Sequence, residues 1–306
     1  WMKIGKAYVE AYNGPVGQLW LGASQAELQL VTGNAQPLSV ETVDLGGTPC
    51  QKQVFADKDL YFNQNGQLVL INVTKPVYED ALAKALEPYA KAGEQVLYFN
   101  LTAKFSSSYQ SITLIAEELM EEYPACKIIV VDSYSATVQE GLLVTEAARM
   151  AEDGLTLEEA AKRIETLKMT SRIFFTTADL SYLQKGGRVG KAMIQVASML
   201  KIKPMIQLYE GELQAAGIVR SRKKSLQRFI DDTKRFFKDK NINDYRICTG
   251  YGYDKEEFDA LYAEVVKEMR QLGFQGEVEQ YHIGCTIGVH TGPTPIGIAV
   301  IRKYDA

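Results

Sequence analysis

A short apolar run, Gln95 to Leu101, leads directly into three consecutive serines and then into an amphipathic helix. This junction constrains the fold more than any other stretch of the chain. Ser106, Ser107 and Ser108 are predicted to lie on a strand-to-helix turn, which in an open parallel sheet borders the crevice where ligands bind. Because the first N–H groups of a helix lack intrahelical partners, the turn predicts either an anion site or simple capping of the helix by Ser106.

Strand-type and helix-type segments alternate on both sides of this turn. The apolar runs Gln67 to Val73 and Lys127 to Val131 are typical of buried strands, and a helix is predicted to begin near Pro76. The order strand, helix, strand, helix, strand predicts a parallel sheet with right-handed crossovers. We therefore interpret residues 1–170 as an N-terminal α/β domain.

The second half of the chain has a different pattern. A capping box at Thr156 predicts a helix from Leu157 to Met169, and after it strand-like runs are joined at Glu210-Gly211 as a hairpin. A long helix, Lys255 to Leu272, and further strands follow. Hairpin-linked strands combined with helices predict an α+β domain with a mixed or antiparallel sheet over residues 171–306.

The composition excludes several classes of partner. The 306 residues include 34 basic and 38 acidic side chains, a formal charge of −4, so no overall positive charge attracts nucleic acid or anionic lipid. No apolar run reaches the roughly 18 residues of a membrane span, and the N-terminus lacks the pattern of a signal peptide. We expect a cytoplasmic protein with no nucleic acid partner and no stable membrane insertion.

The cysteines and histidines are few and scattered. The four cysteines form no CxxC pair, and there are two histidines. This pattern predicts neither a disulfide framework nor a metal site. Cys126 and Cys248 lie in or just before apolar runs, where a buried thiol acts as a small hydrophobic group.

The run Gly284 to Gly297, GCTIGVHTGPTPIG, is rich in Gly, Pro and Thr. Such a composition predicts a loop whose backbone conformation matters. His290 lies in the middle of this loop. A histidine in a loop is either a polar surface residue or a functional one, and the pattern leaves both interpretations open.

Two basic segments adjoin predicted turns. The run Lys185 to Lys191 does not have the spacing of a P-loop, but an arginine on a glycine turn, Arg188, can bind a carboxylate or a phosphate. Four cations lie at a predicted strand-to-helix junction: Arg220, Arg222, Lys223 and Lys224. Positive charge there opposes the helix dipole. It indicates either a solvated helix start or docking of an acidic partner or a phosphate.

Several catalytic signatures are absent from the sequence. It contains no GxSxG motif and no GxGxxG motif after a strand. Ser106 as nucleophile and His290 as base would make a serine-dependent hydrolase or acyltransferase. The sequence identifies no acid that would orient the histidine.

Six stretches together resemble the DegV family of bacterial fatty-acid-binding proteins, the B subunit of the two-component fatty acid kinase. The resemblance runs from about Pro76 to Tyr304, and its specificity comes from the order and separation of the stretches. They read FSSSYQS, VVDSYSATVQEG, LSYLQKGGRV, IKPMIQLYEGEL, RSRKK and IGVHTGPTPIG.

The resemblance implies two α/β-type domains with a long-chain fatty acid held between them, and no cofactor besides that ligand. The fatty acid carboxylate would be bound at the serine turn and at a second turn before the preceding helix. The arginine of KGGR and the histidine of HTGP would lie near the headgroup and the surface that meets the kinase. The implied ligand-binding residues are Thr74, Ser106, Ser107, Ser108, Arg188 and His290.

The chain departs from the family's pattern in three places. The opening strand that ends in an Asp-Ser-Thr turn is not found between Met2 and Thr48. Ser107 and Ser108 stand where the family usually carries Gly and Thr. Lys75 adds a positive charge to the turn that contains Thr74.

On this resemblance we expect a non-catalytic, lipid-binding subunit. It would shield a fatty acid and present the carboxylate to a fatty acid kinase catalytic subunit, which transfers phosphate from ATP to give an acyl phosphate. The basic segment Arg220 to Lys224 is the expected partner-binding surface. A lipid-responsive regulator that uses the same segment on another partner is a further interpretation.

Overall fold

The structure is a computed structural model that describes residues 37–45, 48–54, 58–62, 64, 68–73, 75–178, 180–185, 187–188 and 202–306. The chain divides into two compact units, residues 1–87 and 88–306. The predicted boundary near residue 170 lies inside the second unit, between the 3₁₀ helix η2 (Lys168–Thr170) and β7 (Arg172–Thr176). It remains a prediction about the finer organisation of that unit.

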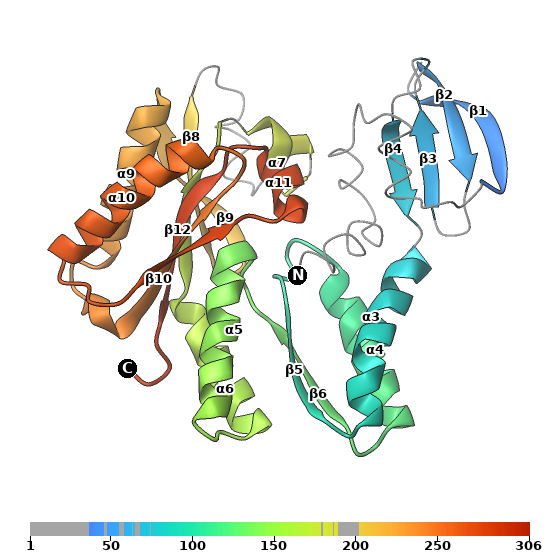
Figure 1. Ribbon diagram of the computed structural model, residues 1–306, viewed down its shortest axis with the longest axis horizontal. Coiled ribbons are helices and arrows are strands. Elements are labelled where there is room, and N and C mark those ends of the chain that lie inside the picture. Colours follow the sequence, from blue (N-terminus) through green and yellow to red (C-terminus); the bar gives the residue numbers. More distant parts are fainter. Residues whose placement is uncertain are drawn as a thin grey trace. The chain divides into compact units, whose positions relative to one another are not determined.

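Four strands of the first unit form an antiparallel meander in the order β1-β2-β3-β4 (Figure 1). The strands are β1 (Ser39–Leu45), β2 (Thr48–Val54), β3 (Lys58–Phe62) and β4 (Leu68–Val73). The predicted strand Gln67 to Val73 is therefore present as β4, but its assignment to a parallel sheet is wrong. An apolar strand followed by a helix does not specify its pairing partner, and β4 pairs with β3, its neighbour in sequence.

A pair of parallel strands begins the second unit. β5 (Gln95–Asn100) and β6 (Lys127–Asp132) pair in parallel and are connected through α4 (Ser108–Glu122). α3 (Lys75–Lys91), which precedes them, contains the boundary between the two units. α4 packs against β6, and α6 (Leu157–Leu167) packs against both strands. The strand–helix–strand crossover confirms the α/β character predicted for this part of the chain.

A mixed sheet of six strands forms the remainder of the second unit, in the order β11-β10-β12-β7-β8-β9. β10 and β11 are parallel, and the other neighbours are antiparallel, as predicted for an α+β arrangement. The other strands are β8 (Lys203–Tyr209), β9 (Glu212–Val219), β10 (Tyr245–Tyr251), β11 (Val278–His282) and β12 (Ile296–Arg302).

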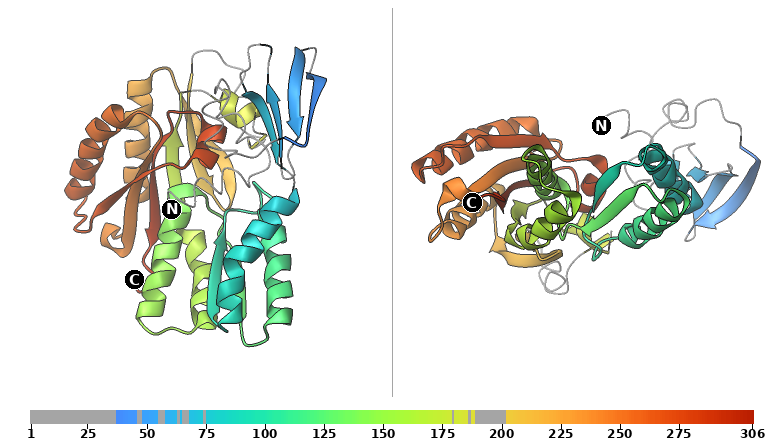
Figure 2. Two further views of the ribbon diagram at one scale, coloured as in Figure 1. Left: turned by 45° about the vertical axis from the view of Figure 1, so that its right-hand side comes forward. Right: turned by 90° about the horizontal axis from the view of Figure 1, so that it is seen from below.

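Helices cover both faces of this sheet (Figures 1 and 2). Along β7, Ile173 and Phe175 belong to the core cluster formed with α5 (Thr137–Glu152), whereas Phe174 belongs to the cluster formed with α9 (Arg222–Phe236) and α10 (Lys255–Gln271). β12 alternates in the same way. Successive side chains of a strand point to opposite faces, so a sheet buried on both faces reads as a continuous apolar run.

Local sequence signals mark several element ends correctly. Thr156 and Glu159 form the predicted capping box at the start of α6. The hairpin between β8 and β9 turns at Glu210 and Gly211, both with positive φ, as a tight hairpin turn requires. Residues 191–200, whose sequence is typical of a helix, lie outside the described residues. Among the helices that the structure describes, none is both long and apolar enough to span a bilayer.

Candidate functional site

The serine turn connects β5 to α4. The backbone N–H of Ser108 donates to Ser106 Oγ at 3.2 Å, so the Ser106 hydroxyl satisfies one N–H group of the first turn of α4. The N-cap residue is Ser107, one position later than the capping interpretation placed it. Ser107 is exposed and precedes the helix without a side-chain capping bond. Ser108 is buried, and its Oγ accepts a hydrogen bond from Asn100 Nδ2 at 3.1 Å.

The loop before the serines is held by two other elements. Asp132, at the end of β6, accepts a hydrogen bond from the backbone N–H of Ala103 at 3.1 Å. Thr102 Oγ1 donates to the carbonyl of Gly211 in the β8–β9 hairpin at 3.2 Å. Gly211 has φ +79°, and an added Cβ would lie 2.5 Å from Thr102 Oγ1, so this contact requires glycine.

Arg188 lies beside the serine turn. Its Nε donates to the carbonyl of Phe105 at 3.1 Å, and Phe105 directly precedes Ser106. Arg188 follows the short helix α7 (Ser181–Lys185), 82 residues downstream of Ser106 in sequence. The structure therefore brings together two of the stretches on which the resemblance rests. Thr74, the expected hydroxyl contact from the second turn, lies outside the described residues.

His290 is buried, with 9% of its surface exposed, and lies in the short helix α11 (Cys285–Thr291). The prediction of a loop over the whole stretch is therefore wrong. α11 packs against α7, and at its end Gly292, with φ +80°, lies so close to the Tyr182 ring that a Cβ would be 2.7 Å from it. These tertiary contacts stabilise a helix that the Gly- and Thr-rich sequence does not predict.

The surroundings of His290 favour its neutral form. Burial and, second, the positive charge of Arg188 lower the pKa of His290 to about 4. Its Nδ1 atom is buried and has no hydrogen-bond partner among the described residues. A buried polar atom without a partner costs free energy, and this atom lies close to the positive charge of Arg188.

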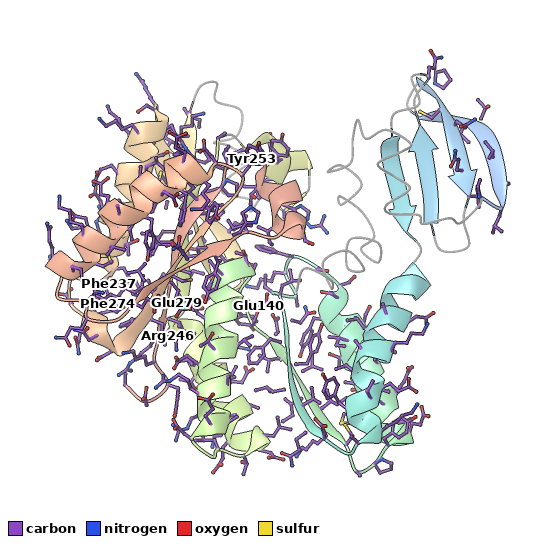
Figure 3. All side chains as sticks on the ribbon, in the orientation of Figure 1. Glu140, Phe237, Arg246, Tyr253, Phe274 and Glu279 are labelled. Carbon is purple, nitrogen blue, oxygen red and sulfur yellow. The ribbon has the colours of Figure 1, made fainter. Side chains whose placement is uncertain are left out.

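Glu140 is a feature that the sequence did not identify as part of the site. It lies in the first turn of α5 (Figure 3), and burial and the nearby Asp132 carboxylate raise its pKa to about 8. Asp132 is the residue that anchors the serine loop through Ala103. The two carboxyl groups come from β6 and from the helix after it, and their proximity depends on the turn between them. In that turn Tyr134 and Thr137 both have positive φ.

The basic segment at the start of α9 divides into two parts. The side chains of Arg220, Lys223 and Lys224 are exposed. Arg222 instead forms an ion pair with Glu257 of α10 at 2.6 Å, with 21% of its side chain exposed. The unfavourable position of this cation relative to the α9 dipole is thus offset by Glu257. Ser221 caps the helix by accepting a hydrogen bond from the backbone N–H of Lys224.

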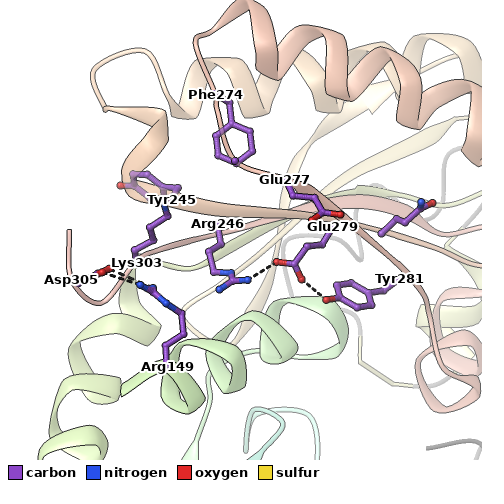
Figure 4. Close-up of a pocket in the computed structure, with 11 residues that line it drawn as sticks. Arg149, Tyr245, Arg246, Phe274, Glu277, Glu279, Tyr281, Lys303 and Asp305 are labelled. Atoms are coloured by element: carbon purple, nitrogen blue, oxygen red, sulfur yellow. Dashed lines mark hydrogen bonds and ion pairs between the residues drawn. The ribbon is translucent and has the colours of Figure 1, made fainter. Parts of the chain in front are cut away.

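Two hollows lined by described residues lie away from the serine turn. The larger, of about 710 Å³, lies at the beginning of β10, and Arg149, Arg246, Glu279 and Asp305 around it form ion pairs (Figure 4). The pairs form a continuous chain through Asp305, Arg149, Glu146, Arg246 and Glu279. In the smaller hollow, of about 310 Å³, Arg228 and Arg235 share Asp232.

Neither the serine–histidine arrangement nor a cluster of metal ligands is found among the described residues. Within the described part of the chain, no hydrogen bond joins the Ser106 hydroxyl to His290, and no group of three or more His, Cys, Asp or Glu side chains is placed to hold a metal ion. Cys126 and Cys248 are buried free thiols, as predicted.

Comparison with known proteins gives consistent matches. A family described as "Uncharacterised protein, DegV family" matches residues 42–303. A DegV domain-containing protein of Clostridium perfringens (strain 13 / Type A) is 32% identical over 220 residues, which cover 72% of this chain and 74% of that protein.

Solved structures share the fold. A fatty acid (stearic acid)-binding protein from Eubacterium ventriosum superposes with a TM-score of 0.70 at 36% identity, over 74% of this chain and 77% of its own. The Streptococcus pneumoniae fatty acid kinase B3 protein, loaded with linoleic acid, has a TM-score of 0.61 at 21% identity, over 74% of this chain and 76% of its own. At that identity the second likeness shows a common fold alone.

Proposed function

This chain belongs to the DegV family, and from that premise we propose that it binds a long-chain fatty acid and presents the carboxylate to a separate kinase subunit. The E. ventriosum relative is described as binding stearic acid, and its identity of 36% supports the same ligand class here. The chain itself would perform no catalysis. Its contribution is to hold the acyl chain and orient the headgroup.

The observation that carries the proposal is the convergence of the serine turn, Arg188 and His290. Arg188 donates to the Phe105 carbonyl next to Ser106, and its charge acts on His290. A carboxylate removed from water needs charge-assisted hydrogen bonds, which hydroxyl, guanidinium and imidazole groups supply. Burial of the acyl chain contributes about 0.8 kcal/mol per methylene, so roughly ten methylenes outweigh the usual cost of association.

The neutral state of His290 fits a site that receives an anion. In the free protein burial and, second, the charge of Arg188 oppose protonation of the imidazole. A bound carboxylate offsets the Arg188 charge and offers a hydrogen-bond acceptor to Nδ1. We expect the pKa of His290 to rise when the fatty acid binds.

The kinase contact is proposed for the exposed cations Arg220, Lys223 and Lys224. Exposed charges of one sign accelerate encounter with a surface of the opposite sign, and their effect falls with ionic strength. Association with the kinase subunit should therefore weaken with added salt, whereas fatty acid binding, driven by apolar burial, should not.

The hydrolase or acyltransferase alternative has less support. A general base works best with a pKa near the operating pH, and the pKa of His290 is lowered to about 4. No hydrogen bond joins the Ser106 hydroxyl to His290 among the described residues. A regulator that docks through the same cations differs from the kinase proposal only in its partner, and a pull-down with and without lipid would detect it.

Native mass spectrometry of the purified protein tests the proposal. We expect a bound acyl chain, or uptake of added stearate, and weaker retention in Arg188→Gln and His290→Ala. Lys223→Gln is the control, because the Lys223 side chain is exposed and is not part of the cluster of the serine turn, Arg188 and His290. No lipid on the protein and no uptake of stearate would contradict the proposal. Turnover of an acyl ester without kinase and ATP would favour the hydrolase.

A further inference from the structure

The segment that follows His290 is fixed by contacts from three other parts of the unit. Thr177, after β7, donates its hydroxyl to the Thr291 carbonyl at 2.5 Å. The backbone N–H groups of residues 252 and 253, after β10, donate to the carbonyls of Pro295 at 2.9 Å and Pro293 at 2.6 Å. Arg222, at the start of α9, donates to the Thr294 carbonyl at 2.9 Å.

Among these hydrogen-bond donors to the segment after His290, Arg222 is the one that carries a charge. Its Nε and Nη2 atoms face the two carboxylate oxygens of Glu257, at 3.0 Å and 2.6 Å, in the bidentate geometry that a guanidinium forms best. The same Nη2 reaches Thr294. One planar group therefore connects α9, α10 and the segment after His290, so the position of Thr294 depends on the Arg222–Glu257 pair.

The orientation of Arg222 distinguishes it from its basic neighbours. Its Nη1 and the Thr294 Oγ1 are buried and have no hydrogen-bond partner among the described residues. Arg222 and Glu257 expose only 21% and 25% of their side chains, whereas Lys223 and Lys224 are exposed. Arg222 therefore points toward the His290 segment, and a docking partner would meet the neighbouring lysines.

We propose that Arg222 and Glu257 are positioning residues for the headgroup site, which consists of the serine turn, Arg188 and His290. The pair sets the conformation of the segment from Gly292 to Pro295 and, through it, the place of His290 relative to Arg188. This inference depends on the proposed function only for the identity of the ligand at His290, a fatty acid carboxylate. It revises the expectation that Arg222 contacts a protein partner.

The experiment compares Glu257→Gln and Arg222→Lys with wild type. Glutamine keeps the shape of Glu257 but loses the charge, and lysine keeps the charge of Arg222 but cannot bind Glu257 and Thr294 in the same plane. Asp259→Asn is the matched control, because it breaks an ion pair with Lys255 on the same helix, with exposures of 55% and 61%. The readouts are the NMR titration of His290 in the ligand-free protein and the dissociation constant for stearate.

In both test variants we expect an altered His290 pKa and roughly tenfold weaker stearate binding, equal to about 1.4 kcal/mol. Asp259→Asn should match wild type in both. An unchanged His290 titration in both test variants would overturn the inference whatever the ligand. If wild type binds no stearate but the titration shifts in the variants, the positioning role stands and the fatty acid proposal fails. A loss of kinase association alone would assign Arg222 to docking and overturn the inference.

Discussion

The two ends of β10 use charged and polar groups in opposite ways. At its beginning, near Arg246 in Figure 3, Glu146 is fully buried but contacts Arg149 and Arg246 at 2.9 Å and 3.4 Å. At its far end, toward Tyr253, the backbone after β10 holds the segment that follows His290. There a buried imidazole nitrogen has no partner among the described residues.

The difference separates groups that stabilise the fold from groups that we propose bind a ligand. A buried ion pair can stabilise a structure only when each charge meets its opposite, as around Glu146. An imidazole kept neutral and incompletely hydrogen-bonded costs stability, and such sites recur where a ligand completes the bonding. The predictions below test this division, beginning with the largest expected effect.

Glu146→Leu should destabilise the protein most, because it leaves Arg149 and Arg246 partly buried without their shared carboxylate. Removing one partner from a buried pair costs about 3–5 kcal/mol. Urea denaturation measures the loss. Fatty acid affinity of the folded protein should be unchanged, since Glu146 lies in the charged chain and not at the serine turn.

Glu158→Gln is the matched control for that change. Glu158 pairs with Lys127 on the surface, with both side chains about half exposed. Exposed pairs contribute roughly 0–1 kcal/mol. A loss equal to that of Glu146→Leu would show that the buried chain has no special role.

Glu140 should make stability fall as the pH rises. Its pKa is near 8 in the folded protein and near 4.5 when unfolded, so between these values the unfolded chain ionises while the folded protein stays protonated. The difference amounts to roughly 5 kcal/mol at most. Glu140→Gln should remove this slope and be more stable than wild type above pH 8. If the free energy of unfolding depends on pH in the same way in wild type and Glu140→Gln, the raised pKa of Glu140 is refuted.

His290 should act in the opposite direction, as the pH falls. Its folded pKa near 4 lies below the unfolded value near 6.5, so stability is full above pH 6.5 and is lost toward pH 4. The loss is roughly 3 kcal/mol. His290→Gln should flatten the curve in this window while leaving the region above pH 7 as in wild type. If the free energy of unfolding of wild type is the same at pH 4.5 and 6.5 after correction for Glu140, the lowered pKa of His290 is contradicted.

Arg188→Gln should weaken stearate binding more than it weakens the fold. Loss of a hydrogen bond to a charged group costs about 2 kcal/mol, or roughly thirtyfold in affinity. A fluorescence displacement assay would measure it. Arg188→Gln should also raise the pKa of His290, because the neighbouring charge is removed. Unaltered affinity would place the headgroup elsewhere.

Ser106→Ala should have the smallest effect on stability, about 1 kcal/mol from the lost hydrogen bond to the Ser108 N–H at the start of α4. Ser107→Ala is its control and should be nearly neutral, because Ser107 makes no side-chain capping bond. If the two variants lose equal stability, the hydrogen bond between Ser106 and the Ser108 N–H does not stabilise the helix. Thermal unfolding of the two proteins distinguishes these outcomes.

Features set by neighbouring residues could be predicted from the sequence. The capping box at Thr156 and the Glu210-Gly211 hairpin follow from side chains and backbone freedom within a few residues. The strand that pairs with β4 could not be predicted, because the apolar sequence of a strand does not specify which strand it pairs with. The resemblance pointed to Arg188 and His290 separately, but only folding brings Arg188 against Phe105.

Other parts of the site depend on contacts that no local pattern contains. α11 forms in a Gly- and Thr-rich run because α7 packs against it. Glu140 was visible only as a residue near a helix start, and its raised pKa depends on Asp132 across a turn. The four cations of the basic segment look alike in sequence, and Arg222 differs because Glu257 lies opposite on another helix.

The most direct test of the headgroup site is the NMR titration of His290 with and without stearate. We predict a pKa near 4 in the free protein and a clear rise when stearate binds, because the carboxylate offsets the Arg188 charge. An ordinary pKa near 6.5 that stearate leaves unchanged would contradict the assignment of His290 and Arg188 to the headgroup.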